Sequence, residues 1–299
     1  MKIIKFLKEW SSEIDWILIG SIIPIIFFGL ITMNSFVESN IYFSRQIVWI
    51  IVSLAVFFVL SLIDFKFLRR TSIVVSIYTL SVLSLLTLFL AGSIFSGAQS
   101  WLDFGFFSVQ PADFAKLALI ITLAKYFSRR HVEIRNFVHL IISGGYALLI
   151  FGLILVQPDF GSALIVFLVW FGMVMVSGLS KKHLSIVFFV GLTAFSILWI
   201  FLLADYQKNR VMTFIHPLED IQGAGYNAYQ SMVSVGSGQM LGKGVGYGTQ
   251  SRLAFLPEYQ TDFIFAAFAE EWGFVGVMIL FVCYGVLIWR IILMLSLSR

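Results

Sequence analysis

Four carboxylates stand in one short stretch of the sequence, FLPEYQTDFIFAAFAEEWGF, residues 255–274. Glu258 and Asp262 precede an apolar run long enough to cross a membrane, and Glu270 and Glu271 follow two turns later. An unpaired carboxylate is costly at depth in a bilayer, so a chain keeps one there only with a partner or a function. For Glu270 and Glu271 we expect hydrogen bonds to a neighbouring helix.

Asp262 has two interpretations. Thr261 or Asp262 could cap the last apolar helix by accepting hydrogen bonds from its first amides. A carboxylate held at a helix N-terminus, at the boundary of water and lipid, is also well placed to act as a general base. Capping alone does not account for Glu258 one turn earlier, and both interpretations stay open on the residues alone.

A lysine lies inside another apolar run, in QPADFAK, residues 110–116. Asp113 and Lys116 are three residues apart, so they either neutralise each other or leave Lys116 to face an anionic group. Asp159, in QPDFG, is a further outer-side carboxylate, although Pro-Asp is also ordinary turn chemistry. Trp101, in GAQSWLDFG, has the alternative role of an anchor at the membrane interface.

Six glycines recur between residues 236 and 248, in GSGQMLGKGVGYG. Neither a Walker A loop nor a G-x-G-x-x-G fingerprint fits this spacing, which excludes a nucleotide site of either kind. Two interpretations remain: a flexible surface loop, or backbone amides that are free to approach a ligand phosphate.

The composition places these residues in a membrane protein. Hydrophobic residues make up 60% of the 299 positions and charged residues 12%, about half the charged share of soluble domains. The basic residues are spread between apolar runs rather than gathered in one patch, which argues against nucleic-acid binding. The single cysteine, Cys283, excludes an intrachain disulfide and a cysteine-based metal site.

Eight apolar runs are long enough to cross about 30 Å of hydrocarbon as helices. We therefore predict one all-α, polytopic transmembrane domain over residues 1–299, with spans at about 16–33, 46–63, 72–95, 111–127, 138–156, 162–178, 184–204 and 263–289. No small-residue cleavage site follows the first run, so we expect a retained helix rather than a signal peptide.

The loops set the expected orientation. Of the 20 Lys and Arg, fourteen lie on one side of the spans and five on the other, so the positive-inside rule puts both termini in the cytoplasm. Residues 96–110 and 205–262 then face outward. The second segment is too long to be structureless without a function, and NAYQSMVSV, residues 227–235, is expected to form a short interfacial helix within it.

These segments resemble the SEDS family of RodA, FtsW and SpoVE. The resemblance rests on HPLEDIQGAGYNAYQSMVSVGSGQMLGKGVGYGTQSRLAFLPEYQTDFIFAAFAEEWGFVG, residues 216–276, with GAQSWLDFGFFSVQPADFAKLAL and QPDFGSAL. The wording is more similar to RodA, the elongation enzyme, than to FtsW, the division enzyme. The resemblance implies a peptidoglycan glycosyltransferase that polymerises lipid II at the outer face of the bacterial inner membrane during cell elongation and shape maintenance.

The resemblance also implies residue roles and a partner. The Asp of the family's T-D-F-I-F motif matches Asp262, the general base, and the Glu of its L-P-E segment matches Glu258, which would support it. Lys116 would neutralise the pyrophosphate of the substrate. The remaining residues assigned to substrate binding are Asp159, which would act through a divalent cation such as Mg²⁺ or Mn²⁺, Trp101, Gln250 and Arg210. A class B penicillin-binding protein, a transpeptidase, is the expected partner.

The chain departs from the family in three places. Ala-Asp precedes Phe-Ala-Lys where the family usually shows Ser-Glu, Gln260 stands where His is common, and the chain stops after eight spans where the family has ten. We therefore expect a form that is truncated after the eighth span. An FtsW-like division glycosyltransferase, a lipid II flippase and an inactive scaffold for the transpeptidase stay open as alternatives.

Overall fold

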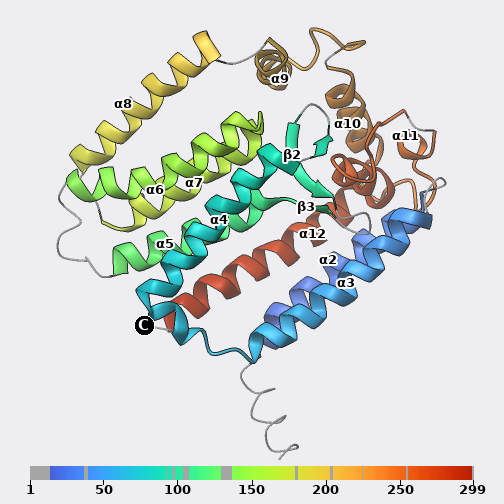
Figure 1. Cartoon of the computed structure of the whole chain (residues 1–299). Coiled ribbons are helices and arrows are strands. Elements are labelled where there is room, and N and C mark those ends of the chain that lie inside the picture. The colour runs from blue at the N-terminus through green and yellow to red at the C-terminus, as the bar shows by residue number, and fades with distance from the viewer. Residues whose placement is uncertain are drawn as a thin grey trace, which may run out of the picture. The chain divides into compact units, whose positions relative to one another are not determined.

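The computed structural model describes residues 14–36, 40–91, 93–95, 98–103, 108–128, 137–178, 181–202, 205–223, 225–253 and 255–297. These residues are mostly helical, which confirms the predicted class, and they include one small antiparallel sheet (Figure 1). The chain forms two compact units, Met1–Ile63 with Leu202–Arg299, and Asp64–Phe201.

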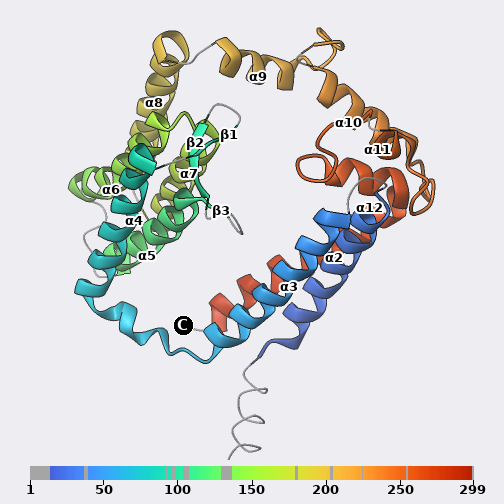
Figure 2. The same cartoon turned by 45° about the vertical axis from the view of Figure 1, so that its right-hand side comes forward.

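The first unit is built from the two ends of the sequence. Its helices are α2 (Trp16–Asn34), α3 (Asn40–Ser61), α9 (Asp205–Ile215), α10 (Tyr226–Ser237), α11 (Thr249–Arg252) and α12 (Ile264–Leu297). Figures 1 and 2 show α12 running beside α2. The ring of Phe28 on α2 lies 4.9 Å from that of Trp272, and the Trp272 indole donates a 3.2 Å hydrogen bond to the Thr32 hydroxyl. At the other end of α2, Arg290 binds the carboxylate of Asp15, which caps this helix.

Gly273 interrupts α12. Its φ of 64° and ψ of −167° are not helical, so the helix has a short part before residue 273 and a long part after it. The 24 residues from 274 to 297 cover about 36 Å at about 1.5 Å per residue, which exceeds the hydrocarbon thickness of about 30 Å. Glu270 and Glu271 lie before the break. They therefore need not enter the hydrocarbon, whereas the sequence pattern had suggested that they lie within it.

The second unit contains the remaining elements. They are η1 (Phe65–Arg69), α4 (Thr71–Ala91), β1 (Ser93–Phe95), β2 (Ala98–Asp103), β3 (Ser108–Val109), α5 (Pro111–Ser128), α6 (Phe137–Val156), α7 (Phe160–Val176), α8 (Lys181–Ile197) and the π-helical turn η2 (Leu198–Leu202). Leu85, Leu119, Ile150 and Val166, one from each of α4 to α7, are fully buried in a shared core. The strands pair in the order β1–β2–β3 and join α4 to α5.

Helices occur at all eight predicted spans. Five are long and apolar enough to cross a membrane: Trp16–Asn34, Tyr42–Ser61, Thr71–Leu88, Phe137–Val156 and Ile264–Ser296. α7 and the segment 185–201 are apolar but shorter, and α5 contains Asp113, Lys116 and Lys125. The protein is therefore a multi-pass membrane protein, while the count of eight crossings and the cytoplasmic location of both termini stay predictions.

Between the spans, the structure differs from the expectation at residues 93–95 and agrees with it at residues 227–235. The span expected at 72–95 ends at Ala91, because residues 93–95 form β1 and pair with β2. The helix predicted at 227–235 is confirmed as α10. α9 and α11 add two more helices to the long segment 205–262.

Candidate functional site

Glu258 and Asp262 lie on one tight turn before α12. The Glu258 carbonyl accepts hydrogen bonds from the amides of Thr261 (3.2 Å) and Phe263 (3.1 Å), and the Thr261 hydroxyl donates to the Glu258 carboxylate at 3.1 Å. Glu258 has a φ of 48°, in the left-handed region that costs a non-glycine residue roughly 1–2 kcal/mol. The surrounding structure must therefore hold this turn in place.

The turn corrects the capping interpretation of Asp262. α12 begins at Ile264, and the amides of its third and fourth residues, Ala266 and Ala267, bond to the Phe263 carbonyl rather than to a side chain of Thr261 or Asp262. Asp262 is exposed, and among the described residues its carboxylate has no hydrogen-bond partner. It is thus open to a ligand hydroxyl, as a general base must be.

The Glu270 carboxylate is fully buried and surrounded by donors. Lys243 donates to its Oε1 at 2.6 Å, the Thr249 amide and hydroxyl donate at 2.8 and 3.0 Å, and the Gln250 amide donates at 3.2 Å. A buried charge needs both a counter-ion and satisfied lone pairs to be tolerated. Glu270 has both, and its partners lie in residues 243–250, with a longer 3.4 Å hydrogen bond from the Ser237 hydroxyl on α10.

Glu271 binds different groups, although it is the next residue. Its Oε1 lies 2.5 Å from the Ser35 hydroxyl at the end of α2 and accepts a 2.9 Å hydrogen bond from the Gly246 amide. Its Oε2 is buried without a partner among the described residues. Both glutamates are held by hydrogen bonds as expected, but their main partner is the glycine-rich segment rather than a neighbouring helix, and the end of α2 is the second partner.

The glycine-rich segment 236–248 is docked onto α12, so neither interpretation drawn from its composition holds. The amides of Lys243 and Gly244 donate to the carbonyls of Glu270 and Glu271, at 2.9 and 3.0 Å. In the other direction, the amides of residues 274 and 275, just after the break, donate to the carbonyls of residues 239 and 240. Gly242 has a φ of 82°, and a Cβ there would overlap the Glu271 carbonyl. These amides are already used by α12 and are not free for a phosphate.

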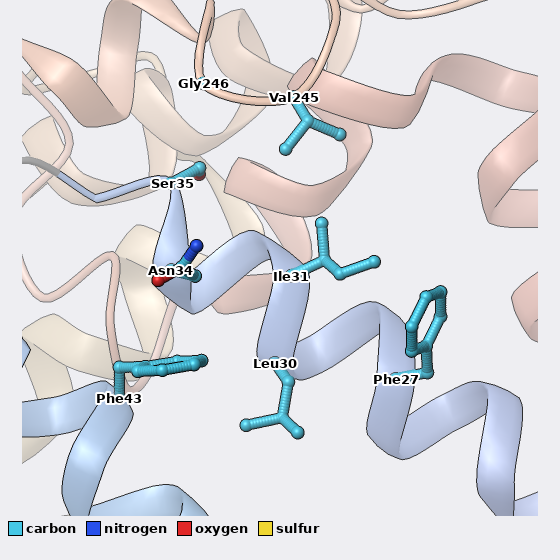
Figure 3. A pocket seen from close by; sticks show the side chains of 8 residues that line it. All are labelled: Phe27, Leu30, Ile31, Asn34, Ser35, Phe43, Val245 and Gly246. Atoms are coloured by element: carbon cyan, nitrogen blue, oxygen red, sulfur yellow. The ribbon is translucent and has the colours of Figure 1, made fainter.

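A pocket of about 330 Å³ lies between α2, α3 and this segment (Figure 3). It is lined by Phe27, Leu30, Ile31, Asn34, Ser35, Phe43, Val245 and Gly246. Glu271 binds both Ser35 and Gly246, so it holds two walls of the pocket together. No ionisable side chain lines the pocket, and we assign no chemistry to it.

In the second unit, Asp159 joins the starts of two helices. It caps α7 by accepting a 3.0 Å hydrogen bond from the Ser162 amide, and its second oxygen accepts a 3.0 Å hydrogen bond from the side chain of Gln110, which precedes α5. Lys116, which lies six residues after Gln110 on α5, forms a 2.9 Å ion pair with Asp113. The Lys116 side chain is 17% exposed and that of Asp113 is 62% exposed, which fits the self-neutralising interpretation.

The other predicted site residues differ in their exposure and in their hydrogen bonds. Trp101 lies on β2 and is 37% exposed. The Gln250 backbone binds Glu270, and its side-chain oxygen is buried without a partner among the described residues. The side chain of Arg210 lies outside the described residues. Lys243 was not predicted, because nothing local in GKG indicates a carboxylate partner 27 residues later.

The described residues include no group of three or more His, Cys, Asp or Glu that could hold a metal ion. The carboxylate ligand proposed for a cation, Asp159, already serves as a helix cap and as an acceptor for Gln110. A cation at Asp159 would therefore compete with both of these hydrogen bonds.

Comparison with known proteins identifies the family. Residues 11–298 match the family of FtsW, RodA and SpoVE, described as "Cell cycle protein". The chain belongs to this family, also called SEDS. It is 39% identical over 219 residues to peptidoglycan glycosyltransferase MrdB of Escherichia coli K12, which covers 72% of the chain and 58% of that protein. It is 32% identical over 294 residues to the probable peptidoglycan glycosyltransferase FtsW of Wigglesworthia glossinidia brevipalpis, covering 98% and 74%.

Two solved structures share the SEDS fold with this chain. One comes from a study of structural coordination of polymerization and crosslinking by a peptidoglycan synthase complex, with a TM-score of 0.75 at 29% identity over 93% of this chain and 77% of the other. The other is the rod shape determining protein RodA of Thermus thermophilus, with a TM-score of 0.64 at 28% identity over 93% and 74%. The chain spans little more than half the length of the MrdB relative that it matches.

Proposed function

We propose that this SEDS protein polymerises lipid II as a peptidoglycan glycosyltransferase at the outer face of the bacterial inner membrane, in the RodA-like role of cell elongation. The names of its relatives support the reaction class. The observation that carries the proposal is the exposed Asp262 carboxylate, which has no hydrogen-bond partner among the described residues and lies on the turn that the Glu258 carbonyl closes. That arrangement presents a base to a substrate hydroxyl.

The reaction joins two sugars and releases a lipid. An acceptor hydroxyl of one lipid II attacks the anomeric carbon of another, a new C–O bond forms, and the bond to the undecaprenyl pyrophosphate breaks. Asp262 takes the proton of the attacking hydroxyl, and the leaving pyrophosphate carries away the bonding electron pair. Glu258, whose carboxylate accepts a hydrogen bond from the Thr261 hydroxyl, would support Asp262 from the same turn.

The leaving group needs positive charge or hydrogen-bond donors. We assign Lys116 to the pyrophosphate, where it would exchange its contact with the exposed Asp113 for a phosphate oxygen. Asp159 would hold a divalent cation such as Mg²⁺ together with the substrate's own phosphates, and it would then give up its hydrogen bonds with Ser162 and Gln110. Trp101, Gln250 and Arg210 complete the proposed substrate contacts, and a class B penicillin-binding protein is the proposed partner.

Polymerisation of labelled lipid II by the purified chain, with and without the partner transpeptidase, tests the function. We expect glycan from the parent chain and a loss of at least roughly 100-fold for Asp262→Asn, the usual contribution of a general base. Glu219→Gln is the matched control, since Glu219 is an exposed acid in the same long segment. Equal activity of Asp262→Asn and parent would refute the role of Asp262, and no glycan from any form would favour the scaffold.

A further inference from the structure

Lys243 and Glu270 form an ion pair that the proposed chemistry does not use. The ammonium and the carboxylate are 2.6 Å apart, and the Glu270 side chain is 0% exposed. Glu270 therefore cannot touch a substrate. Lys243 also donates to the Thr249 hydroxyl at 2.7 Å, so this cation is already committed to its own protein.

The pair fixes the start of α11. Glu270 accepts the amides of Thr249 and Gln250, the first two residues of this four-residue helix. The carbonyl of Gln250 in turn accepts the amide of Leu256 at 3.1 Å. One carboxylate on α12 thus sets where the chain leaves the glycine-rich segment and where it turns back toward α12.

From Leu256 the contacts reach the turn that carries the candidate base. Leu256 is fully buried and shares a core cluster with Tyr259 and Phe36, and the rings of the latter two meet edge to face at 4.7 Å. Tyr259 directly follows Glu258, whose carbonyl closes the turn onto Phe263. A continuous run of hydrogen bonds and packed side chains therefore connects Glu270 to the turn that holds Asp262.

We infer that Lys243 and Glu270 are positioning residues, which lock the glycine-rich segment onto α12 and thereby hold Glu258 and Asp262 in their working geometry. The inference rests on the proposed function for its catalytic meaning. A base that is displaced by about 1 Å can lose roughly 100-fold in rate, so a distant ion pair can matter to the reaction without contacting a substrate.

The first test is kinetic. Lys243→Met keeps the length of the side chain and removes its charge, and we expect kcat to fall roughly 10- to 100-fold while the KM for lipid II changes little. Lys243→Arg keeps the charge and should retain most of the parental kcat. Lys208→Met, on α9, is the control for removing a lysine from the same unit. Rates are expressed per folded protein, measured by size-exclusion chromatography.

The second test needs no activity. In a Cys283→Ala background, Thr261→Cys places a thiol on the turn and Glu219→Cys places one elsewhere in the long segment. We expect Lys243→Met to raise the alkylation rate at position 261 and to leave the rate at 219 unchanged. An unchanged rate at 261, or a kcat for Lys243→Met equal to that of Lys243→Arg, would overturn the inference. If the parent forms no glycan, the proposed function fails and the alkylation rates still decide whether the pair holds the turn.

Discussion

Glu270 and Glu271 show how neighbouring residues of one type can have different surroundings. Successive side chains on a helix point about 100° apart, so Glu270 faces Lys243, Thr249 and Gln250, whereas Glu271 faces Ser35 and Gly246. Glu270 has a lysine and several other donors. Glu271 has two polar partners, and its second oxygen has none within the part of the chain that the structure describes.

The two glutamates should therefore respond differently to neutralisation. Glu270→Gln removes the counter-ion of Lys243 and places an amide among donors, and breaking a buried pair in this way costs roughly 3–5 kcal/mol. Glu271→Gln removes no ion pair, so its cost should be nearer to that of one hydrogen bond, about 1 kcal/mol. Thermal unfolding of both variants in the same detergent checks this order, and a larger loss for Glu271→Gln would contradict it.

The sequence indicated candidate site residues where they lie close together within one motif. Glu258 and Asp262 are four positions apart, and their turn follows from local chain geometry. The partners of Glu270 could not be predicted, because they depend on how the segment 236–250 folds back onto α12. Asp262 was expected as a helix cap or a base; the start of α12 at Ile264 argues against the cap, and the role of base stays a prediction.

Among the elements, the glycine-rich segment and α12 share backbone hydrogen bonds, which makes some glycines irreplaceable. Gly242→Ala would place a Cβ against the Glu271 carbonyl at a φ of 82°, so we expect a stability loss above the roughly 1 kcal/mol of unfavourable left-handed backbone. Gly285→Ala, in the long part of α12 with nothing within 4 Å of the new Cβ, should be neutral or slightly stabilising. Unfolding temperatures of the two variants measure the contrast, and equal values would mean that the docking is not required.

The cap of α2 and the far end of α12 form a second link between elements. Burial works to raise the pKa of Asp15, but hydrogen bonds from Arg290 and from the amides of Leu18 and Ile17 outweigh it and hold the pKa below its usual value. A lowered pKa in the folded state stabilises the protein above the usual aspartate pKa of about 3.9. That contribution is lost as the pH falls through the folded-state pKa.

Asp15→Asn should accordingly lower the unfolding temperature at neutral pH, and the difference from the parent should shrink as the pH falls below about 4. Asp64→Asn is the control, because its ion pair with Lys66 is exposed on both sides and such pairs contribute little. A difference for Asp15→Asn that stays constant down to low pH would show that Asp15 acts by packing rather than by charge.

For the whole molecule, hydrophobic run lengths predicted every long helix, because membrane thickness constrains length more strongly than any local signal. They did not predict the break at Gly273 or the strand β1. Both depend on backbone partners that lie elsewhere in the chain, on residues 239 and 240 and on β2. Seven residues assigned to one site are divided between two units, and sequence order alone could not show that.

The predicted orientation can be checked with the chain's own chemistry. Cys283 is the single cysteine, so one substitution, Cys283→Ala, gives a background for labelling. Glu219→Cys should react with a membrane-impermeant maleimide in intact cells, and Lys66→Cys should react only after the membrane is opened, as the distribution of Lys and Arg requires. Labelling of Lys66→Cys from outside would reverse the orientation and move the proposed reaction to the other face.

The break at Gly273 leaves amides and carbonyls that an unbroken helix would pair within itself, and the backbone of residues 239–244 takes them up. Residues 239–244 and residues 270–275, some thirty positions apart in the sequence, thus form one hydrogen-bonded unit. A residue inserted on either side shifts every one of these bonds out of register, whereas a matched change on both sides preserves them. Across the SEDS family, the lengths of these two stretches should therefore be inherited together, even where their side chains diverge.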